Sequence, residues 1–138
     1  MVSIKNLNLT EVKRFAQSLG EACKSGNFVI GFVGPLGAGK TTFIKSFAKS
    51  FGIKKIKSPS FLVMNTHKRG KRKFYHLDFY RLKNIHELEH LGIWEILNEQ
   101  NRTVVVEWVD ILPKMKKYCN FIIKLQIEKN NRRDVTII

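Results

Sequence analysis

The first half of the chain alternates between helical and extended spacing of its apolar residues. One helix is predicted from Thr10, which can cap its start, to Gly26, which ends it. Its apolar side chains recur on one face, at Val12, Phe15, Leu19 and Cys23. Residues 28–33 are apolar throughout and predict a strand. A second helix is predicted over residues 40–51, with Gly52 as its stop.

A hairpin and two short helices are predicted next. Segments 61–66 and 73–78 are extended and are joined across a basic turn, as the two strands of a hairpin are. Asn84 and Glu87 then have the spacing of a capping box, ahead of an apolar helical pattern. Because Gly92 interrupts that pattern, we expect two short helices there.

The C-terminal part is predicted to be mainly strand. Residues 103–106 form a β-branched run typical of a buried strand, which ends at Glu107. Segments 121–128 and 134–138 predict two more strands joined by a polar turn. The whole order is α/β with added antiparallel hairpins, so we expect a mixed central sheet. With 138 residues, the chain is expected to form one domain over residues 1–138.

A phosphate-binding motif lies between the predicted strand 28–33 and the helix after it. The segment fits G-x-x-x-x-G-K-[ST] without a gap. Glycines let backbone N–H groups turn toward phosphate oxygens, Lys40 reaches the terminal phosphates, and the Thr41 hydroxyl can ligate Mg²⁺. We therefore expect a nucleoside triphosphate as ligand and a three-layer fold like that of P-loop NTPases. The candidate nucleotide-binding residues are Gly34, Pro35, Leu36, Gly37, Ala38, Gly39, Lys40, Thr41 and Thr42.

Two acidic residues end strands that are predicted to lie near this loop. A P-loop needs such an acid, because oxygen ligands must hold the Mg²⁺. Glu107 stands where a Walker B acid is expected, and Asp78 ends the segment 73–78. Both are candidate metal ligands together with Thr41, and both are candidate catalytic residues together with Lys40. Which acid positions or activates water stays open.

Three further features of the sequence bear on the same site. Trp108 follows the second acid, where its ring either stacks on a base or packs in the core. The loop Ser58-Pro59-Ser60 offers hydroxyls to a γ-phosphate or its metal, although Ser-Pro is also a common turn. His76 alternates with Asp78, so both are expected on one face of their strand.

The net charge of +14 points to an acidic partner such as nucleic acid. Residues 54–73 hold eight Lys or Arg and no acid, yet Lys outnumbers Arg 18 to 7, which a general compositional bias explains equally well. No apolar run approaches the ~20 residues that cross a bilayer, and a signal-peptide pattern is missing, so we expect a cytoplasmic protein without a membrane partner. Two cysteines are too few for a disulfide framework.

Five blocks of sequence resemble, in order and spacing, the TsaE family of small bacterial P-loop ATPases in the tRNA threonylcarbamoyladenosine pathway. They are GPLGAGKTTF at 34–43, SPSFLV at 58–63, HLDFYRL at 76–82, ELEHLGIWEIL at 87–97 and VVVEWVD at 104–110. The resemblance covers about residues 10–110, and the final hairpin agrees in pattern only. The chain has Ser60 where the family usually has Thr, and Val109 where it usually has Pro; neither change removes a reacting group.

The resemblance implies ATP and Mg²⁺ as ligands and gives each site residue a role. Lys40 and Thr41 match the P-loop lysine and the Mg²⁺ hydroxyl, and Glu107 matches the second acid of the metal site. Asp78 matches the acid that hydrolysis needs, and Trp108 matches a tryptophan close to the nucleotide. Thr10, where the resemblance begins, is added to the candidate nucleotide-binding residues.

The resemblance also implies partners. In that family the ATPase binds the TsaD–TsaB assembly, which transfers threonylcarbamoyl to adenosine in tRNA, and its ATP cycle resets or sustains turnover. We expect slow ATP hydrolysis by this chain alone. The basic hairpin at residues 68–73 becomes a candidate contact with tRNA or with an acidic partner surface.

Two other functions fit a compact P-loop protein. A small-molecule kinase needs an acceptor pocket and usually an Arg-rich lid, for which this chain has few Arg. An ATP-gated RNA-binding switch is favoured by the charge. GTP is disfavoured, because no N-K-x-D motif occurs. Arg81 lies close to Asp78 in sequence and is a candidate arginine finger, or else the ion-pair partner of a neighbouring carboxylate.

Overall fold

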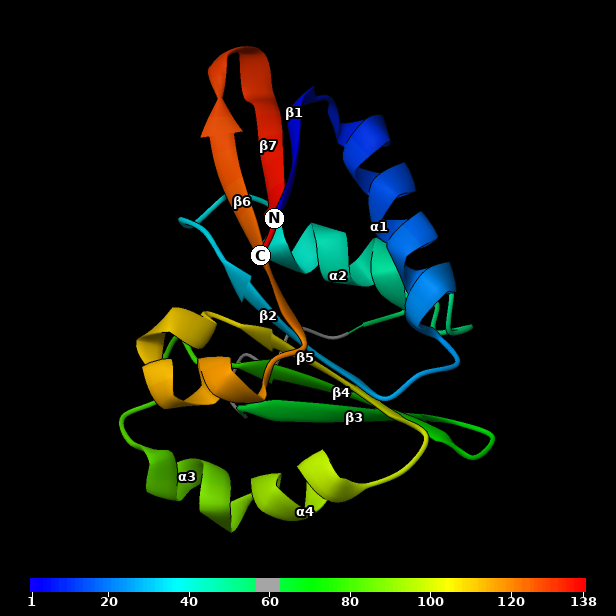
Figure 1. Ribbon diagram of the computed structural model, residues 1–138, viewed down its shortest axis with the longest axis vertical. Coiled ribbons are helices and arrows are strands. Elements are labelled where there is room, and N and C mark those ends of the chain that lie inside the picture. The colour runs from blue at the N-terminus through cyan, green and yellow to red at the C-terminus, as the bar shows by residue number, and fades with distance from the viewer. Residues whose placement is uncertain (57–62) are drawn as a thin grey trace.

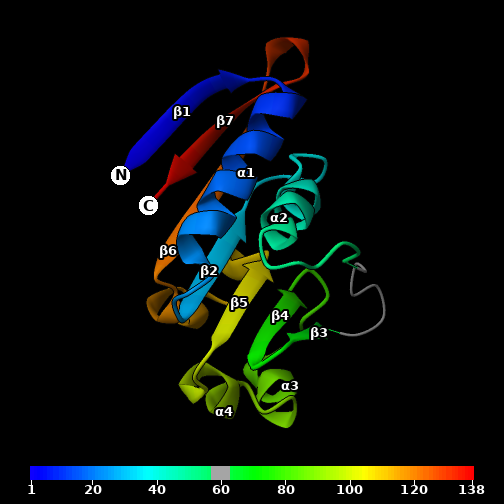
Figure 2. The same cartoon turned by 90° about the vertical axis from the view of Figure 1, so that its right-hand side faces the viewer.

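Seven strands form one mixed sheet in the order β1-β7-β6-β2-β5-β4-β3, in a computed structural model that describes residues 1–56 and 63–138. Figure 2 shows this order from β1 at one edge to β3 at the other. The four central strands are parallel to one another: β6 (Phe121–Glu128), β2 (Phe28–Val33), β5 (Arg102–Glu107) and β4 (Arg72–Asp78). The outer strands pair antiparallel: β1 (Val2–Leu7), β7 (Arg132–Ile137) and β3 (Met64–Arg69). The predicted mixed sheet with antiparallel hairpins is confirmed.

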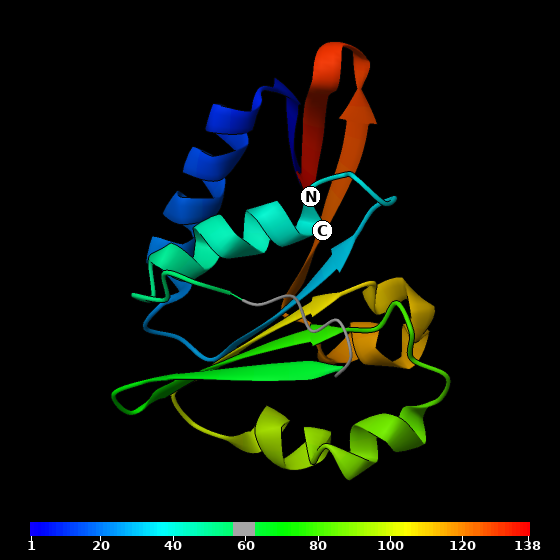
Figure 3. The same cartoon turned by 180° about the vertical axis from the view of Figure 1, so that it is seen from behind.

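Helices cover both faces of this sheet, which gives three layers (Figures 1 and 3). One face carries α1 (Leu9–Cys23) and α2 (Lys40–Lys49). The other carries α3 (Ile85–His90), α4 (Ile93–Asn98), η1 (Val109–Ile111) and η2 (Pro113–Tyr118), and η3 (Lys129–Asn131) forms the β6–β7 turn. Across residues 1–56 and 63–138, every helix falls short of the length and apolar character that crossing a membrane requires.

The core lies on both faces of the central strands, which explains the uninterrupted apolar run 104–106 within β5. Val105 is buried in the cluster beneath α1 and α2, whereas Val104 and Val106 are buried in the cluster beneath α3, α4 and η2. A strand covered on both faces has no side that requires polar residues. The strand therefore carries Glu107 to a fixed position at its carboxyl end.

The first helix begins after Asn8, so the prediction that Thr10 caps it is wrong. Asn8 Oδ1 accepts a hydrogen bond from Glu11 N at 2.8 Å, and Glu11 Oε1 accepts one from Asn8 N at 3.0 Å. This reciprocal pair is a capping box, which satisfies two backbone donors at once where Thr10 would satisfy one. Thr10 is an exposed residue of the first turn, and the helix ends at Cys23, ahead of Gly26.

Two predicted turns are shorter in the structure than in the sequence analysis. The β3–β4 turn is confined to Gly70 and Lys71, so residues 68 and 69 belong to β3; residues 61 and 62 lie outside the described part. Likewise, β7 already begins at Arg132. Left-handed backbone at Gly70 (φ 58°) and at Asn130 and Asn131 (φ 60° and 58°) lets the chain reverse quickly.

The two short helices are confirmed, and their caps differ slightly from the expectation. Gly92 precedes α4 in a left-handed conformation (φ 76°) and separates it from α3. Asn84 caps α3 by accepting from His86 N at 2.9 Å. Glu87 instead accepts from Lys83 N at 3.2 Å, so the predicted reciprocal capping box is replaced by two separate bonds.

Asp134 on β7 ties the N-terminal strand to the sheet. The backbone N–H of Asn6 donates to Asp134 Oδ1 at 2.8 Å, and Lys5 Nζ lies 3.3 Å from Oδ2. The bond from Asn6, and then the Lys5 charge, hold the pKa of Asp134 below its usual range. A carboxyl whose folded pKa is lowered stabilises the fold above its unfolded pKa of about 3.9, and loses that contribution as pH falls through the folded pKa.

We therefore expect Asp134→Asn to lower the melting temperature at neutral pH and to converge with the wild type below about pH 4. The asparagine keeps an acceptor for Asn6 N and removes only the charge. Thermal unfolding followed by circular dichroism from neutral to acidic pH measures the gap. Glu21→Gln, which removes an exposed partner of Lys24, is the matched control and should change little at any pH. A gap for Asp134→Asn that persists unchanged into acid contradicts the assignment.

Candidate functional site

The carboxyl ends of β2, β5 and β4 meet at one edge of the sheet and surround a cavity of about 410 Å³. Asp78 and Glu107 are register partners on adjacent strands, so both acids face this edge together. Ligands of open α/β sheets bind at this end of the strands. The cavity is lined by Leu36, Gly37, Gly39, Lys40, Thr41, Thr42, Asp78, Tyr80, Glu107 and Trp108.

The loop between β2 and α2 has the backbone conformation that an anion cradle needs. Gly34, Gly37 and Gly39 all have positive φ, at 151°, 80° and 100°. A Cβ added at Gly34 would lie 2.6 Å from the carbonyl oxygen of Leu125, so a larger residue does not fit without a shift. No side chain of the described residues caps the start of α2. Its first N–H groups and the helix dipole are therefore directed at the cavity.

Lys40 is held against its own loop. Its Nζ donates to the carbonyl oxygens of Gly34 at 2.6 Å and Pro35 at 3.0 Å, and lies 3.9 Å from the Trp108 ring centroid. The residue is 5% exposed. Burial lowers the pKa of its ammonium group, and nearby carboxylates, chiefly Glu107, act against that shift. The lysine charge is thus positioned beside the phosphate cradle in a poorly hydrated place, where it interacts strongly with an anion.

Glu107 is fixed by partners on two other elements. Thr41 Oγ1 donates to Glu107 Oε1 at 2.7 Å, and His76 Nε2 lies 2.6 Å from Oε2. Glu107 is 3% exposed and His76 is fully buried. The Thr41–Glu107–His76 chain therefore connects α2, β5 and β4. The sequence indicates only that His76 shares a face with Asp78, because no local pattern shows that β4 lies next to β5.

Asp78 has a different environment. Its Oδ1 accepts from Tyr80 N at 2.9 Å, and the described residues give its carboxylate no second hydrogen bond. Burial raises the pKa of Asp78, and the charge of Glu107 adds to this rise while the bond from Tyr80 opposes it. A half-buried carboxylate with remaining acceptor capacity suits a water-orienting role.

Trp108 and Tyr80 form an aromatic wall of the cavity. Their ring centroids are 5.0 Å apart, and Trp108 has left-handed backbone (φ 59°) that turns it out of β5 toward Lys40. Trp108 is half-buried, so its ring is not fully packed in the core. Both interpretations from the sequence, stacking on a base and packing in the core, therefore fit part of the ring. Tyr80 was not among the predicted site residues, although it lies two positions after Asp78 in the HLDFYRL block.

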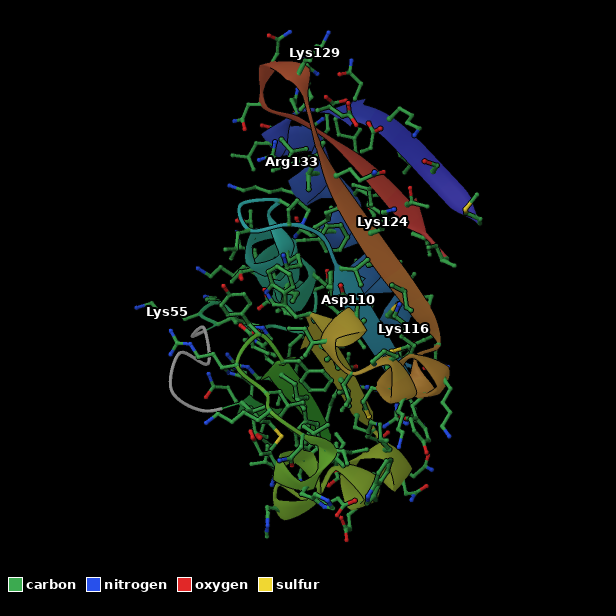
Figure 4. All side chains as sticks on the ribbon, turned by 90° about the vertical axis from the view of Figure 1, so that its left-hand side faces the viewer. Lys55, Asp110, Lys116, Lys124, Lys129 and Arg133 are labelled. Carbon is green, nitrogen blue, oxygen red and sulfur yellow. The ribbon has the colours of Figure 1, made fainter. Side chains whose placement is uncertain are left out.

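A second residue that sequence reasoning missed is Arg133, which supports the P-loop from outside. Its Nε donates to the carbonyl oxygen of Ala38 at 2.9 Å and its Nη2 to that of Gly37 at 3.1 Å. Figure 4 shows Arg133 reaching from β7 toward this loop. Binding these carbonyls on the outer side helps keep the loop N–H groups turned inward. Only the sheet order brings residue 133 beside residue 38, so no local sequence signal indicated the contact.

Arg133 also lines a smaller cavity of about 130 Å³ on the outer side of the loop. Its walls are Leu9, Val12, Gly37, Ala38, Gly39, Thr42, Asn131 and Arg133. Thr10 stands between two of these residues on α1 but lines neither of the two cavities.

We predict that Arg133→Gln raises the KM for nucleotide roughly tenfold, since two charge-assisted hydrogen bonds to the loop are lost, and that kcat falls less. Arg132→Gln is the matched control: it removes the same charge one residue away, where Arg132 contacts Asn6 and Glu11 instead of the loop. Steady-state kinetics on both variants check this. An equal KM for the two variants would show that Arg133 does not shape the loop.

Two other predicted features are not among the described residues that line this cavity. The Ser58-Pro59-Ser60 loop lies outside the described residues. Arg81 is exposed and does not line the cavity.

The oxygen atoms of Thr41, Glu107 and Asp78 are the hard ligands that Mg²⁺ prefers, so these residues fit a Mg²⁺ site completed by phosphate oxygens.

A glycine-rich loop that opens a helix, with its threonine bonded to an acid at the end of the adjacent strand, defines a P-loop nucleotide-binding protein. The chain belongs to the TsaE family, because the family model described as "Threonylcarbamoyl adenosine biosynthesis protein TsaE" matches residues 7–135. The recognition made from sequence is thereby confirmed.

Similar proteins span most of the chain. A Bacillus subtilis protein named "tRNA threonylcarbamoyladenosine biosynthesis protein TsaE" is 32% identical over 133 residues, covering 96% of this chain and 82% of the relative. Proteins of the same name from Rickettsia felis and Aquifex aeolicus are 33% and 32% identical, covering 95% and 90% of this chain and 76% and 86% of the relatives. The crystal structure of Bacillus subtilis YdiB superposes with a TM-score of 0.70 at 27% identity, covering 99% of this chain and 83% of that one.

Proposed function

We propose that this chain is an ATPase that supports threonylcarbamoyladenosine modification of tRNA in the cytoplasm, acting with the TsaD–TsaB complex. The observation that carries the proposal is the grouping of Lys40, Thr41, Glu107 and Asp78 around one cavity, in a chain that belongs to the TsaE family. The relatives' names supply the pathway, and the cavity supplies a place for nucleotide chemistry.

Binding is proposed to begin at the loop and the start of α2. Backbone N–H groups of the loop and of α2 surround the phosphates, and Lys40 exchanges its bonds to the Gly34 and Pro35 carbonyls for phosphate oxygens. Because Lys40 is already buried next to the cavity, this exchange needs little movement. Thr41 and Glu107 would hold Mg²⁺, which neutralises charge on the phosphate oxygens when bound.

The two acids are proposed to divide the work. Glu107 uses both carboxylate oxygens for Thr41 and His76, so its position is fixed and its charge is available to the metal side of the site. Asp78 accepts one backbone bond and is therefore assigned to orient, and to accept a proton from, the attacking water. We thus assign the water-activating role to Asp78; the sequence left open which of the two acids has it.

Hydrolysis by the isolated chain is proposed to be slow. Among the described residues that line the cavity, Lys40 is the only cation, and none is an arginine. Charge that develops during phosphoryl transfer is often stabilised by an arginine supplied by a partner, worth about 10³–10⁵ in rate. The TsaD–TsaB complex is the partner proposed to stimulate the reaction.

Measuring ATP hydrolysis with and without TsaD–TsaB and tRNA tests this function. We expect low hydrolysis by the wild type alone, strong stimulation by the assembly, and no stimulation of Lys40→Ala. If the partners leave hydrolysis unaffected while phosphate appears on a small-molecule acceptor, the chain is a kinase and the proposal is wrong.

A further inference from the structure

A third cavity, of about 510 Å³, lies between the end of α2 and the outer edge of the sheet. One wall is the segment that follows α2, with Lys54 and Lys55; the other is β3, with Lys68 and Arg69. We call this feature the basic groove and define it by these four residues. In Figures 1 and 3, the loop after α2 and the β3–β4 turn project at the same margin of the molecule.

The basic groove is distant from the nucleotide cavity. Lys68 and Arg69 pair with Lys73 and Arg72 at the start of β4, whereas the nucleotide cavity contains Asp78 at the end of that strand. The two sites therefore lie at opposite ends of β4, and the two cavities have no lining residue in common.

The four cations of the basic groove are not neutralised by the rest of the described chain. All four are exposed, and none forms an ion pair with a carboxylate among residues 1–56 and 63–138. Lys73, on the same hairpin, does have an acid nearby, with Glu99 at 3.8 Å. Burial lowers the pKa of the neighbouring His67, so its ring adds no charge at neutral pH.

A protective role for edge charges explains only half of this arrangement. Lysine and arginine on an edge strand prevent pairing with another sheet, which would account for Lys68 and Arg69 on β3. It does not account for Lys54 and Lys55, which come from a separate segment and line the same cavity. Two walls of like charge around one hollow repel each other and are stabilised by an anion between them.

The lining also indicates which kind of polyanion fits. Protein interfaces have an apolar or aromatic centre, whereas nucleic-acid interfaces are more polar and strongly positive. The single aliphatic residue in the lining, Ile53, is 4% exposed, and the other members are Thr66, His67 and the four cations. The exposed surface of the groove is therefore almost entirely polar or cationic.

We infer that the basic groove binds the phosphate backbone of tRNA, with Lys54, Lys55, Lys68 and Arg69 each close to a phosphate. Binding of tRNA here rests on the proposed function, because tRNA is named in the pathway of the relatives. The sequence alone indicated the whole hairpin 68–73 as a contact; the groove contains only the β3 side of that hairpin, together with the segment after α2. Binding through phosphates predicts strong salt dependence and little sequence preference.

The test measures fluorescence anisotropy of a labelled, unmodified tRNA transcript without nucleotide over a range of salt concentrations. The groove variant is K54Q/K55Q/K68Q/R69Q. The control K114Q/K116Q/K124Q/K129Q removes the same charge from exposed lysines on the β6 side, where Figure 4 places Lys116, Lys124 and Lys129 away from Lys55. Circular dichroism melting confirms that both variants are folded. ATP hydrolysis by the groove variant alone should match that of the wild type. The anisotropy measurement therefore tests tRNA binding by the groove, and the hydrolysis measurement separately tests the proposed ATPase function.

We expect the groove variant to bind tRNA at least about tenfold more weakly and to lower the slope of log affinity against log salt by about three, with the control slope changed by less than about one. If the groove variant does not fold, K54Q/K55Q and K68Q/R69Q should each give about half of that change. Equal weakening by groove and control variants would overturn the inference, since net charge alone would explain binding. So would unchanged tRNA binding together with lost binding to TsaD–TsaB, which would assign the groove to a protein surface.

Discussion

Lys40→Ala is expected to lower ATP hydrolysis at least about 100-fold, in the presence of TsaD–TsaB and tRNA, to the level seen without this chain. The ammonium group of Lys40 is the only cation among the described residues that line the nucleotide cavity, so nothing else there compensates for its loss. Removal of one preorganised charge contact in a poorly hydrated site costs about 10²–10³ in rate. Nucleotide binding, measured with a fluorescent ATP analogue, should weaken as well.

The control for this variant is Lys45→Ala, on the exposed side of the same helix. It removes the same charge and side-chain length without touching the cavity, and should hydrolyse ATP like the wild type. Because Lys40 also bonds two loop carbonyls, thermal unfolding must show that Lys40→Ala remains folded. A folded Lys40→Ala that hydrolyses ATP within a few-fold of Lys45→Ala would contradict the site.

Asp78→Asn and Glu107→Gln are expected to change different kinetic properties of ATP hydrolysis. Asp78→Asn removes the group assigned to accept a proton from water, so kcat should fall about 100-fold or more while the Mg²⁺ requirement stays unchanged. Glu107→Gln removes the charge assigned to the metal side and disturbs the bonds to Thr41 and His76. We expect it to raise the Mg²⁺ concentration that gives half-maximal hydrolysis and to lower kcat.

Hydrolysis measured across a Mg²⁺ titration separates these effects. His76→Gln serves as a further control for the Glu107 side, because it removes the ring that holds Oε2 and leaves the carboxylate in place. It should shift the Mg²⁺ requirement in the same direction as Glu107→Gln, and less. If Asp78→Asn shifts the Mg²⁺ requirement and Glu107→Gln does not, the two roles are reversed.

The parts of the site that local sequence encodes were predictable, and those that depend on strand order were not. The P-loop is one continuous segment, and the acids at 78 and 107 follow runs whose apolar patterns mark strand ends. The contact of Glu107 with His76 requires that β4 lie beside β5, and the contact of Arg133 with the P-loop requires that β7 lie near the carboxyl end of β2. No local sequence pattern indicates which strands lie near each other in the sheet.

The fold shows the same division between local and distant information. Central strands and the helix pair around Gly92 follow from continuous apolar runs and a glycine stop. The alternating residues 2–7 form an edge strand that pairs with the last strand of the chain, and nothing nearby in the sequence indicates that partner. The N-terminal helix start was misplaced because Asn8 and Thr10 are both residue types that cap helices, and only the reciprocal bond between Asn8 and Glu11 decides between them.

We propose that ATP hydrolysis by this chain sustains tRNA modification by TsaD–TsaB. The most direct test counts threonylcarbamoyladenosine formed per TsaD–TsaB complex over time, in a reconstituted reaction with the wild type or with Lys40→Ala. We expect many rounds of modification with the wild type, and with Lys40→Ala no more product than without the chain. As many rounds with Lys40→Ala as with the wild type would show that ATP hydrolysis by this chain is not needed for turnover.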